Sequence, residues 1–463
     1  MSEQRDRGKQ RDGERSRSNE RLLDRQAERE SNTRMHPRYI PMAIDRAEGV
    51  TLIDVEGNEY VDCLAGAGSI PLGHNHPAVV GPVRETLDRE RPTHTLDLTT
   101  PEREAFLDTL LATFPPEFAE NARIQFCSPA GTDAVEAALK LMRTATGNRD
   151  VLAFRGAYHG MTAGSLALMG DTAPREEVEV PGHVHHLPYP YEYRPPLGIG
   201  GEAEHRALAR EVETALEDPL SGVEDPGAMV VEPVQGEGGS IPAPDEWLRE
   251  MRRITREHDV PLVVDEVQAG VGRTGSMYAF EHAGIVPDAV CLSKAVGGGV
   301  PLSVLLYHER YDEWASGAHL GTFRGHQLGM AAERGTLEYI VEHDLPAHAA
   351  RVGERLTSCL DESADGRPEL ADVRGRGLML GVEIVDAGQP TNDDSSHPLD
   401  ADLAMSIQRE CFDRGLIVER GGREGATIRF LPPLIVSESE AIRSPSASKR
   451  ALRRHSTGKG VRP

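Results

Sequence analysis

Six short apolar runs alternate with helical patterns along the middle of this chain, and this alternation constrains the fold more than any other feature. Continuous apolar runs are typical of strands that are covered on both faces, and the helical segments between them provide the crossovers that parallel strands need. The pattern therefore predicts an α/β fold with a mainly parallel sheet. The runs are RIQFC (123–127), VLAF (151–154), AMVV (228–231), PLVV (261–264), AVCL (289–292) and SVLL (303–306).

The two ends of the chain differ from this body. Residues 1–34 hold 10 basic and 8 acidic side chains with almost nothing apolar, which predicts a disordered charged arm or a frayed helix. Residues 441–463 hold seven basic and no acidic side chains and include the helix breaker Pro445, so we expect a disordered basic tail. Residues 437–440 still have the N-cap and early acids of a helical turn. We interpret the abrupt change after them as translation in a shifted reading frame, with a genuine basic arm as the alternative.

The charge of the chain excludes several classes of partner. The net charge of the chain is -24. The body between the two ends contains 34 basic and 67 acidic side chains, a pattern that resembles adaptation to high salt. Such a surface repels nucleic acid and anionic membranes, so we expect neither as a partner. No apolar stretch approaches the roughly 18 residues of a membrane helix, and the N-terminus lacks a secretory core, so we expect a cytoplasmic protein. The five widely spaced cysteines predict buried, reduced thiols.

Distinctive residues follow the ends of the predicted strands, where parallel sheets bind their ligands. Lys294 is one of only two lysines in the body, and it stands between a strand and three glycines. The other, Lys140, falls within a helical pattern and is interpreted as a solvated surface residue. The residues at strand ends are Gly131, Thr132, Tyr158, Glu232, Asp265 and Lys294.

This set matches the needs of pyridoxal 5'-phosphate, which requires an amine for covalent attachment, a partner for its ring nitrogen, a phosphate cradle and a surface for its ring. Lys294 offers the amine. Asp265 ends a buried strand, where a carboxylate needs a cationic partner such as a protonated pyridine nitrogen. Without Lys294, Asp265 could equally form a structural ion pair or bind magnesium.

The phosphate cradle and the stacking surface are weaker signals. Gly131 and Thr132 begin a helix that Val135 and Met142 mark by their spacing, and a helix N-terminus presents unpaired backbone donors to an anion. The alternative for Thr132 is a simple helix cap. Tyr158 could stack on the ring, although an isolated aromatic is more often part of the core.

The chain also resembles the class III aminotransferases of fold type I, over about residues 35–438. The resemblance implies a large cofactor-binding domain at 101–330 with a mainly parallel seven-stranded sheet. It also implies a smaller α+β domain formed by 35–100 and 331–440. The similar blocks, in order, are SPAGTDAVEAALKLMR, AYHGMTAGSLALMG, VVEPVQGEGG, VVDEVQAGVGRTG, LSKAVGGGVPL, GTFRGHQL, VRGRGLMLGVEI and IRFLPPL.

The resemblance implies a role for each matched cofactor residue. Lys294 would hold the cofactor and move the proton, and Asp265 would pair with the ring nitrogen. Thr322 would bind the phosphate of a second subunit, which implies a homodimer. The remaining matches are Gln268 near the ring hydroxyl, Gly131 and Thr132 at the phosphate, Tyr158 at the ring, and Glu232 in the cofactor site.

The family also implies how substrates are recognised. Arg429 matches the arginine that binds the α-carboxylate of 2-oxoglutarate, and Glu237 matches the acid that covers it while an ω-amine is bound. Met161 stands where relatives such as ornithine aminotransferase have a substrate-binding arginine, which speaks against ornithine or 4-aminobutyrate. Further blocks, including THTLDLTTP and YPYEYRPPLGIGGEAE, resemble the branch that moves the 4-amino group of L-2,4-diaminobutyrate to 2-oxoglutarate.

Three alternatives remain open at this point. The chain could use another ω-amino acid, it could be an aminomutase or racemase of the same fold, or it could be a non-catalytic acidic dimer. The pairing of Arg429 with Glu237 argues against the mutase, because that pair suits alternation between two substrates. A pyridoxal phosphate site requires no metal, so we predict none, although several histidines are suitably spaced: His74, His76, His183, His185 and His186.

Overall fold

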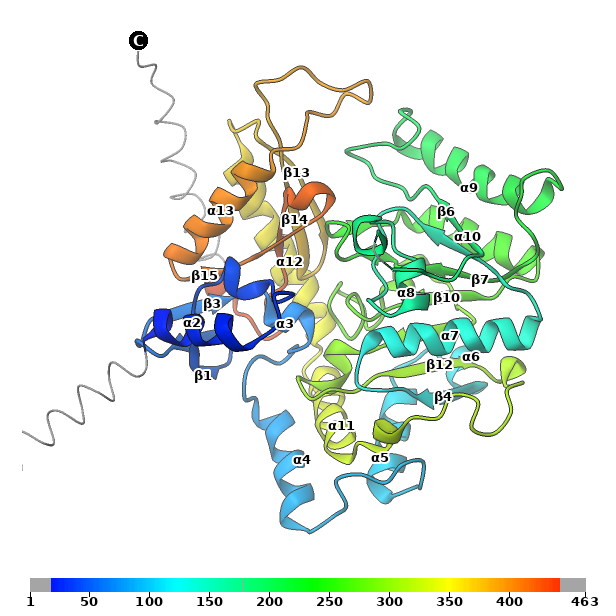
Figure 1. Ribbon diagram of the computed structural model, residues 1–463, viewed down its shortest axis with the longest axis horizontal. Helices are drawn as coiled ribbons and strands as arrows, with labels where there is room; N and C mark the ends of the chain where they lie inside the picture. Colours follow the sequence, from blue (N-terminus) through cyan, green and yellow to red (C-terminus); the bar gives the residue numbers. More distant parts are fainter. Residues whose placement is uncertain (1–17, 177, 442–463) are drawn as a thin grey trace, which may run out of the picture.

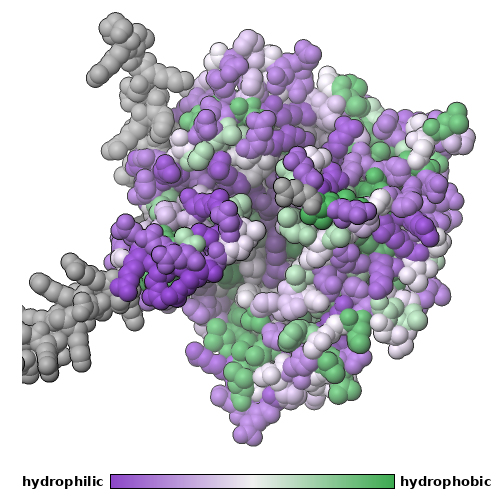
Figure 2. Space-filling view, viewed as in Figure 1, coloured by the Kyte–Doolittle hydropathy of each residue, from purple (hydrophilic) through white to green (hydrophobic). Residues whose placement is uncertain are grey.

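The computed structural model of the chain describes residues 18–176 and 178–441. Its larger part is built on a seven-stranded sheet. Its smaller part combines segments from both sides of the chain, drawn in blue and in orange, which lie side by side (Figure 1). Hydrophilic side chains cover most of the face that Figure 2 shows, as the acidic composition predicts.

The seven-stranded sheet has the order β4-β12-β11-β10-β7-β5-β6. β10 is parallel to β11 and β7, and β5 is parallel to β7 and β6, whereas β12 is antiparallel to both β11 and β4. The expectation of a mainly parallel seven-stranded sheet is therefore confirmed. The strands are β4 (Ala122–Phe126), β5 (Asp150–Phe154), β6 (Val184–Leu187), β7 (Pro226–Val231), β10 (Leu262–Asp265), β11 (Ala289–Leu292) and β12 (Val304–His308).

Helices cover both faces of this sheet. On β10, Val263 packs in the cluster that contains the buried face of α7 (Gly131–Thr146), whereas Val264 packs in the cluster that contains Trp247 of α10 (Asp245–Glu257). Successive residues of one strand are thus buried on opposite faces, which explains the continuous apolar runs. The other helices here are α5 (Pro101–Leu111), α6 (Pro116–Ala119), α8 (Ala163–Ala167) and α9 (Gly201–Glu217), and a hairpin joins β8 (Val234–Gln235) to β9 (Ile241–Pro242).

The edge strand β6 was not predicted, because its sequence VHHL is not a continuous apolar run. An edge strand is less enclosed than a central one and does not need such a run. His183 Nδ1 and His185 Nε2 both contact the carboxylate of Asp150, at 2.8 and 2.6 Å. Both histidines therefore have a structural partner, Asp150, within the fold.

The smaller part contains two four-stranded sheets. In the first, β1-β2-β3-β15, the C-terminal β15 (Leu416–Ile417) pairs in parallel with the N-terminal β3 (Glu59–Asp62), so the pairing joins the two flanks. The second sheet has the order β13-β14-β17-β16. The predicted domain boundaries themselves stay predictions. The remaining elements are β1 (Ile44–Glu48), β2 (Thr51–Asp54), α3 (Ala65–Gly68), α4 (Pro77–Asp88), α11 (Gln327–Glu342), α12 (Leu345–Ala364), β13 (Leu370–Arg376), β14 (Met379–Ile384), α13 (Ala401–Asp413), β16 (Glu419–Gly421) and β17 (Thr427–Phe430).

Of the two expectations for residues 1–34, a disordered arm or a frayed helix, the structure shows a helix in the second half. Residues Asn19–Arg29 form the helix α2, and Ser18 caps it by accepting a hydrogen bond from the Arg21 backbone N–H. Asn19 fixes this helix to the first sheet, because its side-chain amide donates to Asp54 at 2.8 Å and its carbonyl oxygen accepts from Ala43 N–H at 2.7 Å. Specific hydrogen bonds thus replace the apolar contacts that the composition lacks. Residues 1–17 lie outside the described part.

The helical turn predicted at Ser437 is confirmed. The Ser437 hydroxyl accepts from the Glu440 backbone N–H, and the Glu440 carboxylate accepts from Ser437 N–H at 2.9 Å. The predicted disorder from residue 442 onward and the reading-frame interpretation lie outside the described residues. Within 18–176 and 178–441, no helix combines the length and apolar character that crossing a membrane requires.

Replacing Gly353 with alanine is expected to destabilise the smaller part of the fold. A Cβ at this position in α12 would lie 2.1 Å from the carbonyl oxygen of Gly377. Because this neighbour is backbone, elements must shift, at a cost of about 1–3 kcal/mol. The unfolding temperature, followed by circular dichroism, should fall. The control is Gly81→Ala in α4, where nothing lies within 4 Å and alanine is the better helix former. An unfolding temperature that stays level in Gly353→Ala would contradict the packing argument.

Candidate functional site

Eight of the predicted cofactor and substrate residues line one cavity of about 290 Å³ at the carboxyl ends of the central strands and the start of α7. Arg429 lies behind this cavity, covered by Glu237, and Thr322 is exposed and does not line it. The structure therefore brings together residues that are far apart in the chain. The eight are Gly131, Thr132, Tyr158, Glu232, Glu237, Asp265, Gln268 and Lys294.

Lys294 occupies an unusual backbone position at the end of β11. It begins the short helix η4 (Lys294–Gly297) with φ = 51°, in the left-handed region that residues other than glycine rarely adopt. Strain of this kind is maintained at functional sites. Burial lowers the pKa of the Lys294 amine, although the negative charge of Glu237 opposes this. A lowered pKa increases the fraction of neutral amine, which is the nucleophilic form.

Asp265 is held by a histidine that the sequence reasoning did not single out. His159 Nδ1 lies 2.7 Å from Asp265 Oδ2, and the other carboxylate oxygen accepts from the Val267 backbone N–H at 3.0 Å. Burial disfavours the charged imidazole, but the contact with Asp265 dominates and raises the pKa of His159. The signal was present in the sequence, because His159 directly follows Tyr158 in the AYHG segment.

The start of α7 fits a phosphate group. Ala130 stands at the N-cap without a side-chain hydrogen bond to the helix, so the backbone donors of the first turn face the cavity region unpaired by a cap. A Cβ on Gly131 would lie 2.9 Å from Val267 Cγ1 and 3.3 Å from Ser293 Cβ. Glycine is therefore required where this loop passes between the segments that carry Asp265 and Lys294.

Glu232 lines the cavity and organises its wall. Its two carboxylate oxygens accept from the backbone N–H groups of Tyr158 and Gly236, each at 2.8 Å. Burial raises the pKa of Glu232 to about 7. These two bonds fix the backbone on which Tyr158 is carried, whereas a direct contact of Glu232 with a cofactor stays a prediction.

Arg429, Glu237 and Gln268 form one hydrogen-bonded unit. Arg429 Nη1 donates to Glu237 Oε1 at 2.9 Å, and Arg429 Nη2 donates to the amide oxygen of Gln268. The Gln268 amide group donates to Glu237 at 3.3 Å and to the Ala67 carbonyl oxygen at 3.3 Å. Arg429 is completely buried, and the charge of Glu237 raises its pKa against the effect of burial. If Glu237 moves aside, a buried cation becomes available to an anionic ligand.

A second carboxylate near Arg429 was not foreseen. Glu419 Oε2 lies 3.9 Å from Arg429 Nη1, and Glu419 Oε1 lies 3.7 Å from His36 Nε2. Glu419 is itself buried, so this charge stays beside Arg429 when Glu237 moves. No local pattern in the sequence distinguishes Glu419 from the many other acids of the chain.

Comparison with known proteins gives a consistent result. The family described as aminotransferase class-III matches residues 33–451. A diaminobutyrate--2-oxoglutarate aminotransferase of Rhizobium meliloti is 52% identical, and the alignment covers 93% of this chain and 92% of that protein. The protein of the same name from Haemophilus influenzae is 47% identical, over 91% of this chain and 93% of that one.

Solved structures agree in fold. An amine transaminase from an uncultivated Pseudomonas species, in its PLP-bound form, has a TM-score of 0.81 at 27% identity and covers 92% of this chain and 98% of its own. An (S)-enantioselective omega-transaminase from Thermomicrobium roseum has a TM-score of 0.83 at 28% identity, with coverage of 94% and 98%.

Replacing His159 with leucine is expected to weaken the binding of pyridoxal phosphate by about tenfold to hundredfold, because a hydrogen bond to a charged group contributes about 1.5–3 kcal/mol. Without it, the Asp265 carboxylate loses the contact that fixes its position in the cavity. Absorbance titration of the apoprotein measures the affinity. His205→Leu on α9, outside the cavity, is the control, and equal affinities of the two variants would contradict the assigned role of His159.

Proposed function

The chain belongs to the class III aminotransferases, and we propose that it moves the 4-amino group of L-2,4-diaminobutyrate to 2-oxoglutarate. The products are L-aspartate 4-semialdehyde and L-glutamate, and the reaction is reversible. The observation that carries this proposal is the buried Arg429, covered by the partly exposed side chain of Glu237, beside the single lysine of the cavity. The two similar relatives span almost the whole chain and act, by their names, on the same pair of substrates.

The residues of the cavity would hold pyridoxal 5'-phosphate, which would supply a carbonyl for covalent attachment and a ring that stores the electron pair of the deprotonated substrate carbon. Lys294 Nζ provides the amine and carries the proton to and from that carbon. Asp265, held by His159, keeps the pyridine nitrogen protonated. The first turn of α7 binds the phosphate, and Tyr158 and Gln268 position the ring.

Two substrates of different charge must use the same cavity in turn. Diaminobutyrate presents its 4-ammonium end to Lys294 and has no carboxylate at that end, so Arg429 stays paired with Glu237. The α-carboxylate of 2-oxoglutarate replaces Glu237 and forms a charge-assisted pair with Arg429. The exposed Met161 at the cavity wall supplies no cation for a second carboxylate, which separates this chain from relatives with arginine there.

The working unit in this proposal is a homodimer, in which Thr322 of one subunit reaches the phosphate site of the other. Thr322 is exposed and lies outside its own cavity, yet its backbone oxygen contacts His94 Nε2. Large apolar side chains are exposed around it: Leu98 at 68%, Leu320 at 71% and Phe323 at 60%. Apolar groups exposed together in this way are typical of a protein interface.

Lys294→Ala should abolish turnover and leave the fold intact, because covalent attachment and proton transfer depend on one amine. Activity is measured with diaminobutyrate and 2-oxoglutarate, and cofactor attachment by absorbance after borohydride reduction. Lys140→Ala, which removes the exposed lysine of α7, is the matched control and should retain full activity. Multiple turnover by Lys294→Ala would refute the proposal.

Arg429→Ala should slow the half-reaction with 2-oxoglutarate by at least about tenfold to hundredfold more than the half-reaction with diaminobutyrate, because a charge-assisted carboxylate contact is lost with only one substrate. Stopped-flow absorbance follows each half separately. Arg429→Lys keeps the charge and covers the case in which alanine disturbs folding. Arg420→Ala on the neighbouring strand is the control. Equal losses in both half-reactions would show that the pair with Glu237 does not separate the substrates.

A further inference from the structure

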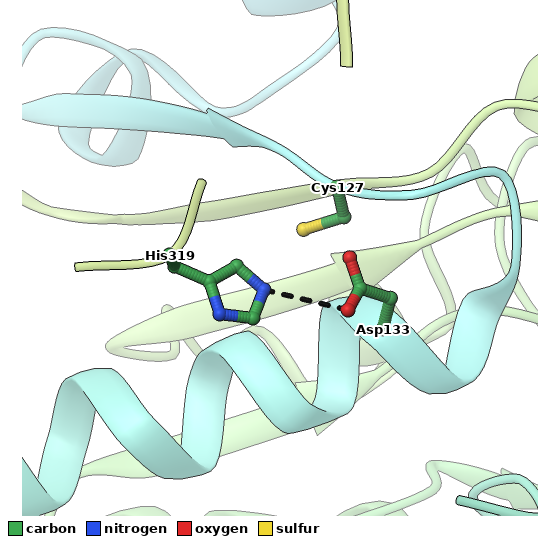
Figure 3. Close-up of side chains that lie close together, drawn as sticks. All are labelled: Cys127, Asp133 and His319. Atoms are coloured by element: carbon green, nitrogen blue, oxygen red, sulfur yellow. Dashed lines mark ion pairs between the residues drawn. The ribbon is translucent and has the colours of Figure 1, made fainter. Parts of the chain in front are cut away.

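A cluster of three possible metal ligands lies beside the cofactor cavity but takes no part in the proposed reaction. Cys127 follows the end of β4, Asp133 lies in the first turn of α7, and His319 lies in the segment before the short helix η6 (Thr322–Gly325). Figure 3 shows the three side chains pointing into one common space between the strand end and the helix. We propose that Cys127, Asp133 and His319 bind one divalent transition-metal ion of the zinc type.

The geometry requires only small movements. One ligand atom from each residue lies within 4.8 Å of the others, and His319 Nε2 is 3.5 Å from Asp133 Oδ1. The ring of His319 is stacked on Trp314, with an interplanar angle of 12°, so its direction is set. Three protein ligands with a water as the fourth form a common tetrahedral zinc arrangement, and sulfur, nitrogen and oxygen are all suitable donors.

An unpaired buried atom independently indicates a missing ligand. His319 Nε2 is buried and, among the described residues, makes no hydrogen bond; its contact with Asp133 Oδ1 is an ion pair at 3.5 Å. A buried polar atom without a partner destabilises the fold unless something else satisfies it. An ion coordinated by this nitrogen would satisfy it.

The surrounding charges suit a dication. Asp133 Oδ2 accepts from the Ser128 backbone N–H at 2.6 Å and from Arg324 at 3.3 Å, which leaves Oδ1 free to face the ion. The Asp133 carboxylate already lies in contact with His319 and with the Ser128 backbone N–H, so it is held in place at the cluster. With Cys127 as the thiolate and Asp133 as the carboxylate, two negative charges would balance the ion.

The ion has a way in. His319 lines two surface hollows of about 680 and 250 Å³, whereas Cys127 is only 1% exposed. Solvent can therefore deliver the ion and its water from the histidine side. Because Asp133 also holds the backbone of Ser128, a bound ion would tie the strand end, the first turn of α7 and the segment of His319 together, directly beneath the predicted phosphate loop.

The test uses the full-length holoenzyme after dialysis against a chelator. Co²⁺ is the probe, because its visible bands report four-coordinate geometry and sulfur ligation at longer wavelengths than the cofactor absorbs. We expect one equivalent to bind with a four-coordinate spectrum and Zn²⁺ to displace it. Because Cys127 binds the ion as the thiolate, metal binding should release a proton.

Matched variants decide between this site and unspecific binding. Cys127→Ser and His319→Gln should each weaken Co²⁺ binding at least about tenfold to hundredfold, the loss seen even when outer partners of a metal ligand are removed. Cys359→Ser, another buried cysteine, and His183→Gln should bind as the wild type does. Zn²⁺ should raise the unfolding temperature of the wild type but not of His319→Gln. Absence of saturable binding, a six-coordinate spectrum, or equal affinity in all four variants would overturn the proposal.

Discussion

Burial of both faces of the central sheet is the constraint on which the rest of the molecule depends. Helices cover each face, and residues such as Val263 and Val264 are completely buried on opposite sides. Polar and reactive groups can therefore stand only where the strands end. Lys294 and Asp265 follow the ends of neighbouring parallel strands, β11 and β10. Their side chains therefore come together at one edge of the sheet, and the site forms there.

The partners of the charged groups at this edge decide whether a group has a fixed position or can bind a ligand. Asp265 is paired with His159, and Glu232 is satisfied by two backbone donors, so both have fixed positions. Arg429 is different, because one of its partners, Glu237, is partly exposed at 34% and can exchange with a ligand carboxylate, while the buried Glu419 stays in place. A buried cation that keeps one permanent counter-charge can accept a substrate anion without ever being left uncompensated.

Local sequence patterns predicted the features of the structure that depend on residues close together in the sequence. The apolar runs marked six of the seven strands, and the scarcity of lysine drew attention to Lys294. The patterns failed where stability comes from specific long-range bonds. The segment of α2 was expected to be a disordered arm or a frayed helix, because its composition gives no hint that Asn19 binds Asp54, 35 residues away. His159 was overlooked although it directly follows Tyr158, because its contact with Asp265, 106 residues further along the chain, is a long-range one.

The sequence by itself determined the fold class, the lysine and aspartate at the strand ends, and the likeness to class III aminotransferases, because these follow from short-range periodicity and from ordered blocks of residues. Only the tertiary structure decided that Glu419 stands behind Arg429 and Glu237, whose pairing the family resemblance had implied, and that Cys127, Asp133 and His319 share one space. Such contacts depend on how two packed parts of the chain face each other, and no local pattern encodes the distance between side chains that different elements carry.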